Sequence, residues 1–282
     1  MALDVQPLSA ALGAEVTGID LNRPLAPGDG AALKAAFAEN LVLVVRDQKD
    51  LTPEAHMQFC ELFGPLGKRS RPADTRAEGA DDPPDVMFVS NRKKDGRFIG
   101  SLPEGEMMFH IDQCYVERPA RATCLYAIVV PDVGGNTLFG NLCDAYDALP
   151  EDLRAIVDSH RALNVFSYDS TSRDQVASSP DARKFVQPMV VGNAVTGRKA
   201  LYVNRLMTFA IEGMDDATGR DVLERLFAHQ ESARFVYSHK WLKDDLLIWD
   251  NQCTVHARAD FDPTHERHLR RFTIDGGPLN AA

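Results

Sequence analysis

Short apolar segments with strand character recur along the whole length of this 282-residue chain. The clearest is the run Leu-Val-Leu-Val-Val at residues 41–45, whose continuous β-branched character predicts a buried strand. Residues 122–130 and 246–250 are similarly apolar. Further strands are predicted at residues 3–20 (two short ones), 86–90, 199–204, 233–238 and 271–275. Strands spread over the entire length favour a mainly β fold.

Helical segments are inserted between these strands. Residues 31–40 are rich in alanine and have apolar side chains at helical spacing, which predicts a helix. A second helix is predicted from Thr52, the N-cap, through Pro53 at the first helical position to about residue 63. Others are expected at 146–159 and 216–230. With no repeat or linker in the sequence, we expect one α+β domain over residues 1–282, mainly β with inserted helices.

Three long polar segments separate the predicted elements, at residues 67–85, 91–107 and 167–184. Long loops in compact domains are often lids or binding loops. The second of them runs directly into Phe109 and His110. We therefore expect lid loops in these three places, with the second one close to substrate.

The charge and cysteine content limit the cellular setting and the partners. A net charge of −10 argues against binding to nucleic acid or to an anionic membrane surface, but not against an anionic small molecule. The five cysteines are an odd number without a C-x-x-C pair, which favours a reducing cytosol. The N-terminus lacks a signal-peptide pattern, and no stretch reaches the roughly 18 apolar residues of a membrane span. We expect a soluble, cytoplasmic protein.

His110 and Asp112 form a His-x-Asp pair that we expect on an extended segment. Side chains alternate across a strand, so both would point to the same side and could meet one metal ion. His256, far downstream, would add a second imidazole. Two histidines and one carboxylate make the facial triad of non-haem Fe(II) oxygenases. Taken singly, His110 could be a hydrogen-bonded core residue and Asp112 a turn residue; taken with His256, the metal site is favoured.

Three of the arginines after His256 cluster at the last strand, Arg267, Arg270 and Arg271. On alternating geometry Arg267 and Arg271 lie on one face of the last strand and Arg270 on the other. Arginine binds carboxylates with two parallel hydrogen bonds and stays charged when partly buried. Two arginines beside a metal would suit a di-anionic ligand or two separate acids. The alternative is an exposed basic strand.

Several motifs, in order, resemble the taurine dioxygenase / 2,4-dichlorophenoxyacetate dioxygenase family of Fe(II)- and 2-oxoglutarate-dependent oxygenases. The resemblance covers nearly the whole chain. The motifs that carry it lie at residues 12–21, 44–48, 63–66, 110–112, 131–139, 249–256 and 267–273. It implies a double-stranded β-helix, the jelly-roll core also found in cupins.

The resemblance also implies roles for individual residues. His110, Asp112 and His256 would hold Fe(II), and Thr137 and Arg267 would bind the distal carboxylate of 2-oxoglutarate. Arg271 would face the other carboxylate of 2-oxoglutarate or an acidic group of the substrate. The implied reaction uses O2 to hydroxylate a C–H bond of a small acidic substrate (a sulfonate, carboxylate, aryloxyacetate or sulfate ester), with succinate and CO2 as co-products. Relatives are commonly dimers or tetramers, so a homo-oligomer is expected.

Two residues beside the triad depart from the family pattern. Phe109 stands where the family commonly has Trp, and Glu106 where taurine enzymes use Asn against the substrate, which argues against taurine. We expect these two positions to influence substrate choice. A zinc-dependent hydrolase could also use the triad with an activated water, but it gives Thr137 and Arg267 no task. A non-enzymatic cupin-like binding protein is the other alternative.

Overall fold

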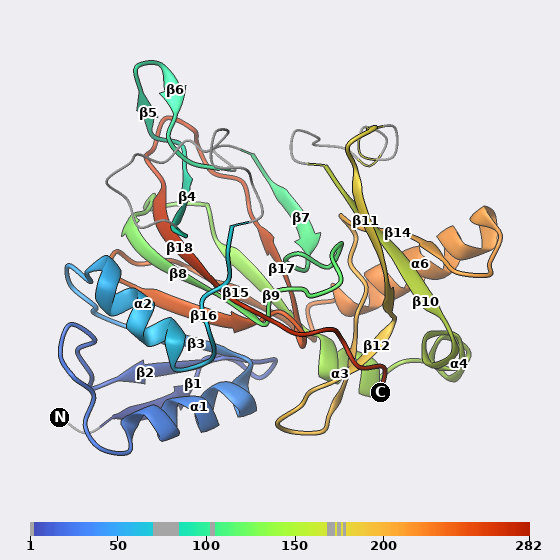
Figure 1. Ribbon diagram of the computed structural model, residues 1–282, viewed down its shortest axis with the longest axis horizontal. Helices are drawn as coiled ribbons and strands as arrows, with labels where there is room; N and C mark the ends of the chain where they lie inside the picture. The colour runs from blue at the N-terminus through green and yellow to red at the C-terminus, as the bar shows by residue number, and fades with distance from the viewer. Residues whose placement is uncertain (1–2, 70–84, 102–104, 168–172, 174–175, 177–178) are drawn as a thin grey trace.

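The computed structural model describes residues 3–69, 85–101, 105–167, 173, 176 and 179–282 (Figure 1). Among them, seven strands form a large sheet in the order β1-β2-β3-β16-β8-β18-β4. Neighbours pair antiparallel, except that β2 pairs parallel with β3. Their bounds are β1 Asp4–Pro7, β2 Ala14–Thr17, β3 Val42–Val45, β16 Leu246–Asp250, β8 Ala122–Val129, β18 His268–Ile274 and β4 Met87–Ser90. All residues of β3 and β16 are buried, as their continuous apolar runs predicted.

A four-stranded sheet packs against this large sheet. Its order is β15-β9-β17-β7, with bounds Val236–His239, Thr137–Asn141, Thr254–Arg258 and Met107–His110. The inward side chains of both sheets form one buried cluster, in which the rings of Phe139 and Trp249 lie 5.5 Å apart. Two packed, mainly antiparallel sheets confirm the expected jelly-roll core of a mainly β chain.

Two helices cover the outer face of the large sheet, α1 (Asp29–Asn40) and α2 (Pro53–Glu61) (Figure 1). Their apolar sides form a second buried cluster with the outward side chains of β3, β8, β16 and β18. The helix N-cap at Thr52 is confirmed, since its hydroxyl accepts a 3.1 Å hydrogen bond from the Ala55 amide. Both faces of this sheet are therefore buried, which explains its continuous apolar strands.

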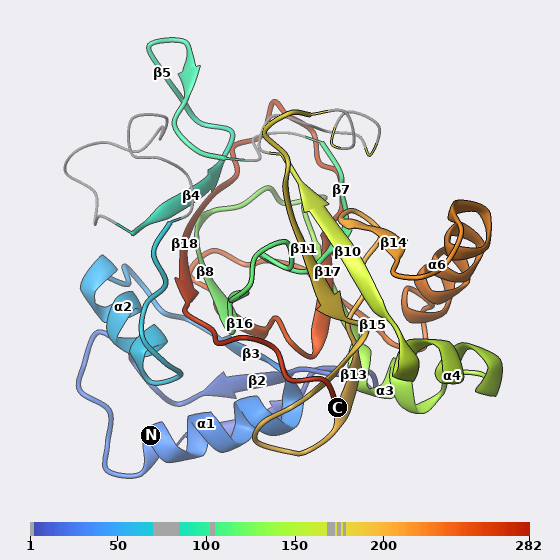
Figure 2. The same ribbon diagram turned by 45° about the vertical axis from the view of Figure 1, so that its right-hand side comes forward.

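Three further helices in the described part of the chain lie beyond the small sheet, away from α1 and α2 (Figure 2). They are α3 (Leu142–Asp147), α4 (Glu151–Ser159) and α6 (Asp216–Gln230). They pack with nearby short strands in a third buried cluster. Those strands are β10 Arg161–Phe166, β11 Arg183–Pro188, β12 Val190–Gly192, β13 Lys199–Leu201 and β14 Thr208–Ile211. The helix predicted at 216–230 is confirmed.

The predicted loop at 91–107 contains structure that the sequence reading missed. Strands β5 (Lys93–Lys94) and β6 (Arg97–Phe98) form a hairpin, and β7 starts at Met107. Asp95 and Gly96 make its turn with φ of 53° and 78°, the left-handed values that an Asp-Gly pair tolerates. Residues 102–104 and much of the other two expected lids, 67–85 and 167–184, lie outside the described residues, so the lids stay a prediction.

The last strand also starts earlier than predicted, at His268 instead of residue 271. All five cysteines are free thiols and buried. Within the described part of the chain, no helix combines the length and the apolar character that crossing a membrane requires.

Candidate metal centre and co-substrate site

The two candidate histidine ligands face each other across neighbouring strands. His110 is the last residue of β7 and pairs directly with His256 of β17. Cross-strand partners on one face have adjacent side chains, and the two ring centroids are 4.1 Å apart. One ligand atom from each histidine and one from Asp112 all lie within 4.8 Å of one another, and all three residues are buried. The structure thus brings together the three residues singled out in the sequence.

Asp112 reaches this position by a different route from the predicted one. Strand β7 ends at His110, and Asp112 lies in the turn that follows, where Gln113 has φ of 58°. Strand alternation therefore does not explain why both side chains meet, and the prediction of an extended segment through Asp112 was wrong. The chain turns back after Ile111, and this turn places the carboxylate beside His256, with Oδ2 3.9 Å from Nε2.

The protonation states of the three residues suit a divalent metal. His110 Nδ1 donates to the Met108 carbonyl at 2.9 Å, because a carbonyl can only accept, and this leaves Nε2 with a lone pair. Burial lowers the pKa of both histidines, so each imidazole is neutral. Burial alone would raise the pKa of Asp112, but the charge of Arg271 leads the opposing effects and holds it well below its usual range. Two neutral imidazoles and one carboxylate fit Fe(II).

A buried hydrogen-bond chain orients the Asp112 carboxylate. The Thr123 hydroxyl donates to Asp112 Oδ2 at 2.7 Å and accepts from the Asn251 amide at 2.9 Å. The Asn251 carbonyl in turn accepts from the Trp249 indole at 2.9 Å. Thr123, Asn251 and Trp249 are at most 1% exposed, so this chain is shielded from water. Sequence reasoning missed the role of Thr123, which stands inside an apolar strand without any local signal.

Replacing Thr123 with valine is expected to lower Fe(II) affinity by about 10- to 100-fold, as changes to partners of metal ligands commonly do. Valine keeps the volume and removes the hydroxyl that aligns Asp112. Fe(II) titration of the purified chain measures the effect, and Thr123→Ser, which keeps the hydroxyl, serves as the matched control. Equal Fe(II) affinity in the valine and serine variants would refute an orienting role for Thr123.

Arg267 is a buried cation without a counter-ion among the described residues. It is 2% exposed, and its Nε and Nη1 have no hydrogen-bond partner there. Burial, with a smaller contribution from the charge of Arg258, lowers the pKa of Arg267 to about 9. Gly135, with φ of 66°, lies against its side chain, and an added Cβ there would come within 3.2 Å of Nε. A desolvated guanidinium is costly without a partner, so this position fits a carboxylate of a bound ligand.

The other two arginines lie on opposite faces of β18, as alternation predicted. Arg271 points inward, and its Nη2 is 2.8 Å from Asp112 Oδ2. Arg270 points outward, where its Nη2 donates to the carbonyls of Leu51 and Thr52. The alternative of an exposed basic strand is wrong, because Arg267 and Arg270 are both buried.

The remaining predicted residues border the site. Thr137 begins β9, next to β17, and its hydroxyl accepts a 2.9 Å hydrogen bond from the Trp241 indole, a partner that the sequence did not suggest. Glu106 is exposed just before β7, and Phe109 in that strand is half-buried. Both therefore lie on the segment that leads into His110.

A jelly roll that holds two histidines and a carboxylate together defines the class of non-haem iron oxygenases. The family model described as "Taurine catabolism dioxygenase TauD, TfdA family" matches residues 4–273. The chain belongs to this family. It is an Fe(II)- and 2-oxoglutarate-dependent dioxygenase that uses O2, so the enzyme class and cofactors expected from the sequence are confirmed.

Individual relatives match this chain over nearly its full length. The chain is 32% identical to an alpha-ketoglutarate-dependent 2,4-dichlorophenoxyacetate dioxygenase of Cupriavidus pinatubonensis, over 97% of this chain and 98% of that protein. It is 31% identical to pentalenolactone F synthase of Streptomyces avermitilis, over 96% and 93% of the two chains. The crystal structure of AAD-2 in complex with Mn(II) and N-oxalylglycine superimposes with a TM-score of 0.78 at 28% identity, covering 99% of both chains.

Proposed function

We propose that His110, Asp112 and His256 bind the Fe(II), and that Thr137 and Arg267 hold the distal carboxylate of 2-oxoglutarate. The observation that carries the second assignment is the buried Arg267 guanidinium, which has no anionic partner among the described residues. A dicarboxylate can supply that partner and still offer its other end to the metal.

When bound, Fe(II) with 2-oxoglutarate and O2 supplies the oxidising power that hydroxylates a substrate C–H bond, with succinate and CO2 released. The protein's own residues hold the metal ligands in place and exclude water from the site. Thr123 fixes the Asp112 carboxylate through a hydrogen bond of 2.7 Å, and Arg271 through an ion pair of 2.8 Å. The low exposure of His110, Asp112 and His256, 6–7%, keeps bulk water away from the reacting atoms.

We infer that the substrate is a small organic acid with an apolar body, of the aryloxyalkanoate type. Arg271 supports this proposal, because its buried Nε has no hydrogen-bond partner among the described residues while its Nη2 is taken by Asp112. The relative from Cupriavidus pinatubonensis is named for an aryloxyacetate. Glu106 and Phe109, on the segment leading to His110, are the positions where we expect discrimination between acids.

The first test of this function needs no substrate. Fe(II) and 2-oxoglutarate added together without oxygen should give the weak visible absorption band of their joint complex. A panel of acids scored by succinate formation should then rank aryloxyacetates above taurine. Absence of the band in folded, metal-loaded protein contradicts the site assignment, whereas a normal band with turnover of taurine alone contradicts only the substrate class.

We also infer that residues 1–282 form one catalytic domain with lid loops at about 67–85, 91–107 and 167–184, and that the protein is a cytoplasmic homo-oligomer, a dimer or tetramer. The family match over residues 4–273 supports a single domain. Sedimentation of the purified chain tests the oligomeric state.

A further inference from the structure

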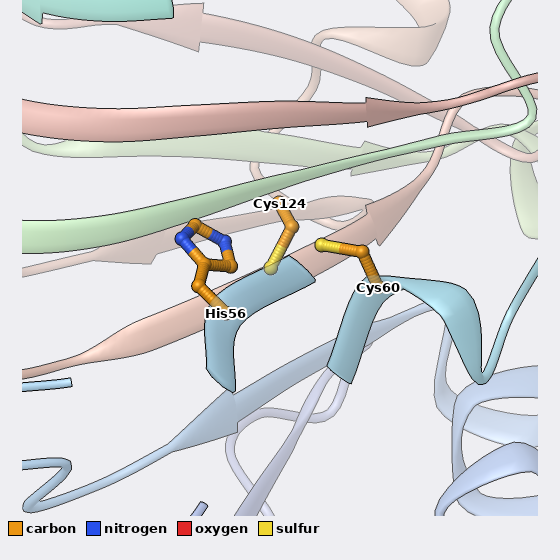
Figure 3. Close-up of side chains that lie close together, drawn as sticks. All are labelled: His56, Cys60 and Cys124. Carbon is orange, nitrogen blue, oxygen red and sulfur yellow. The ribbon is translucent and has the colours of Figure 1, made fainter. Parts of the chain in front are cut away.

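A second group of metal-binding side chains lies on the outer face of the large sheet. His56 and Cys60 are one turn apart on α2, and Cys124 comes from β8 (Figure 3). One ligand atom from each lies within 4.8 Å of the others, and all three residues have an exposed fraction of 0%. In Figure 3 the two sulfur atoms point toward each other, and the imidazole lies beside them with one ring nitrogen on the sulfur side. The iron site is on the opposite face, because Thr123 and Cys124 are consecutive in a strand.

The hydrogen bond to Arg270 determines what His56 can do. Arg270 Nε donates to His56 Nδ1 at 3.3 Å, and burial lowers the pKa of this histidine, so the ring is neutral with its proton on Nε2. Nε2 is buried and has no hydrogen-bond partner among the described residues. A protonated nitrogen cannot ligate a metal, but it can donate to a thiolate. The free Nε2–H of His56 is therefore available to a thiolate that forms when a metal binds, and a three-ligand zinc site is disfavoured.

Charge then decides which ion fits the two sulfurs. Burial raises the pKa of Cys124, and the Cys60 thiol raises it further, while the charge of Arg270 opposes both. Cys124 is thus a neutral thiol until a metal displaces its proton. Among the buried groups, two thiolates, one monovalent cation and the Arg270 guanidinium have zero net charge, whereas a divalent ion would leave a buried positive charge. The Glu54 carboxylate, which also acts on Arg270, is exposed to water and therefore screened. Soft thiolates bind Cu(I), zinc and iron–sulfur clusters, and of these only Cu(I) is monovalent.

We propose that Cys60 and Cys124 form a two-thiolate site for a soft monovalent metal ion of the Cu(I) class. His56 donates its Nε2 proton to a thiolate, and Arg270 supplies the compensating charge. Binding exchanges the two thiol protons for the ion, and no electron is transferred.

The chain contains its own matched control. Cys143 and Cys253 form another pair of buried free thiols in contact with each other. There Asp250 raises the pKa of Cys253. Two cations also act on this pair, Arg121 on Cys253 and Arg198 on Cys143, but each is already paired with carboxylates: Asp250 for Arg121, Asp144 and Asp147 for Arg198. A two-thiolate complex at that pair would carry an uncompensated negative charge. We therefore expect only the pair beside Arg270 to bind the ion.

The experiment uses the full chain loaded with Fe(II) and 2-oxoglutarate, reduced and kept without oxygen. Cu(I) is titrated against the chromogenic chelator bicinchoninate. The parent protein should retain one equivalent of Cu(I), and Cys60→Ser or Cys124→Ser should lose it. The double variant Cys143→Ser/Cys253→Ser should keep it. Arg270→Gln should weaken binding by about 10- to 100-fold, with Arg270→Lys close to the parent protein.

Two further measurements keep the outcome decisive if a serine variant misfolds. In the parent protein, Cu(I) should protect Cys60 and Cys124, but not Cys143 and Cys253, from alkylation in mild denaturant. X-ray absorption at the copper edge should show two sulfur neighbours without nitrogen, in the parent protein and in His56→Gln. Cu(I) retained by both single serine variants, a nitrogen neighbour that His56→Gln removes, or a Cys60–Cys124 disulfide in place of bound copper would each overturn the proposal.

Discussion

Replacing Asp112 with alanine is expected to abolish catalysis and to lower Fe(II) affinity by more than the roughly 100-fold that changes around metal ligands cause. The substitution removes the only carboxylate of the triad. It also leaves the Arg271 guanidinium, 2.8 Å from that carboxylate in the structure, without its partner beside two imidazoles. The repulsion between this cation and the metal adds to the loss of the ligand. Fe(II) titration by calorimetry, in parallel with succinate formation, measures both effects.

The control for this variant is Asp132→Ala, which removes an exposed carboxylate that is not part of the triad. It should leave Fe(II) affinity unchanged. Asp112→Asn separates charge from shape, because it keeps the hydrogen-bonding outline and loses the negative charge; we expect it to resemble the alanine variant. Fe(II) affinity in Asp112→Ala equal to that of Asp132→Ala would exclude Asp112 as a ligand.

Replacing Arg267 with alanine is expected to weaken 2-oxoglutarate binding by about 30-fold or more, since truncating one partner of a buried charge pair costs about 2 kcal/mol at least. Fe(II) affinity should not change, because the guanidinium is proposed to bind the co-substrate and not the metal. Calorimetric titration of the Fe(II)-loaded chain with 2-oxoglutarate measures the first quantity.

Arg267→Lys provides the comparison, because it keeps the charge but not the planar pair of donors. It should bind 2-oxoglutarate with intermediate affinity. Thermal unfolding gives a second readout: at a 2-oxoglutarate concentration that saturates the parent protein, the rise in Tm should be clearly smaller for Arg267→Ala than for the parent. An undiminished Tm increase in the alanine variant would mean that another residue holds the distal carboxylate.

The core of the candidate site could be predicted because its signals are local and ordered along the chain. His110 ends strand β7 and His256 lies in the middle of strand β17. Strand alternation separates Arg271 from Arg270 correctly. The position of Asp112 was predicted for the wrong reason, since strand β7 stops at His110 and a turn supplies the carboxylate. The two-residue spacing of His110 and Asp112 is compatible with a strand and with a turn, so it does not distinguish the two backbone conformations. The chemistry at Asp112 was therefore easier to predict than its conformation.

Contacts between segments that are far apart in the chain could not be predicted from the sequence. His56 and Cys60 are spaced for one side of a helix, but nothing in the chain says that Cys124 faces them, because this depends on how α2 is seated on β8. The hairpin β5–β6 was missed for another reason. Its signal, Asp95-Gly96, was present, but the polar residues around it lack the alternating apolar pattern that usually accompanies such a turn.

Two strands of the large sheet carry site residues on both faces of the sheet. In β8, Thr123 faces the iron site and Cys124 faces α2; in β18, Arg271 and Arg270 divide in the same way. The two sites therefore depend on the odd or even position of each residue along these strands. A single-residue deletion within β18 would exchange the two arginines between the faces and damage both sites together, whereas a change of two residues would preserve the parity. A single-residue insertion or deletion in these strands therefore affects both sites together, although the two sites share no ligand residue.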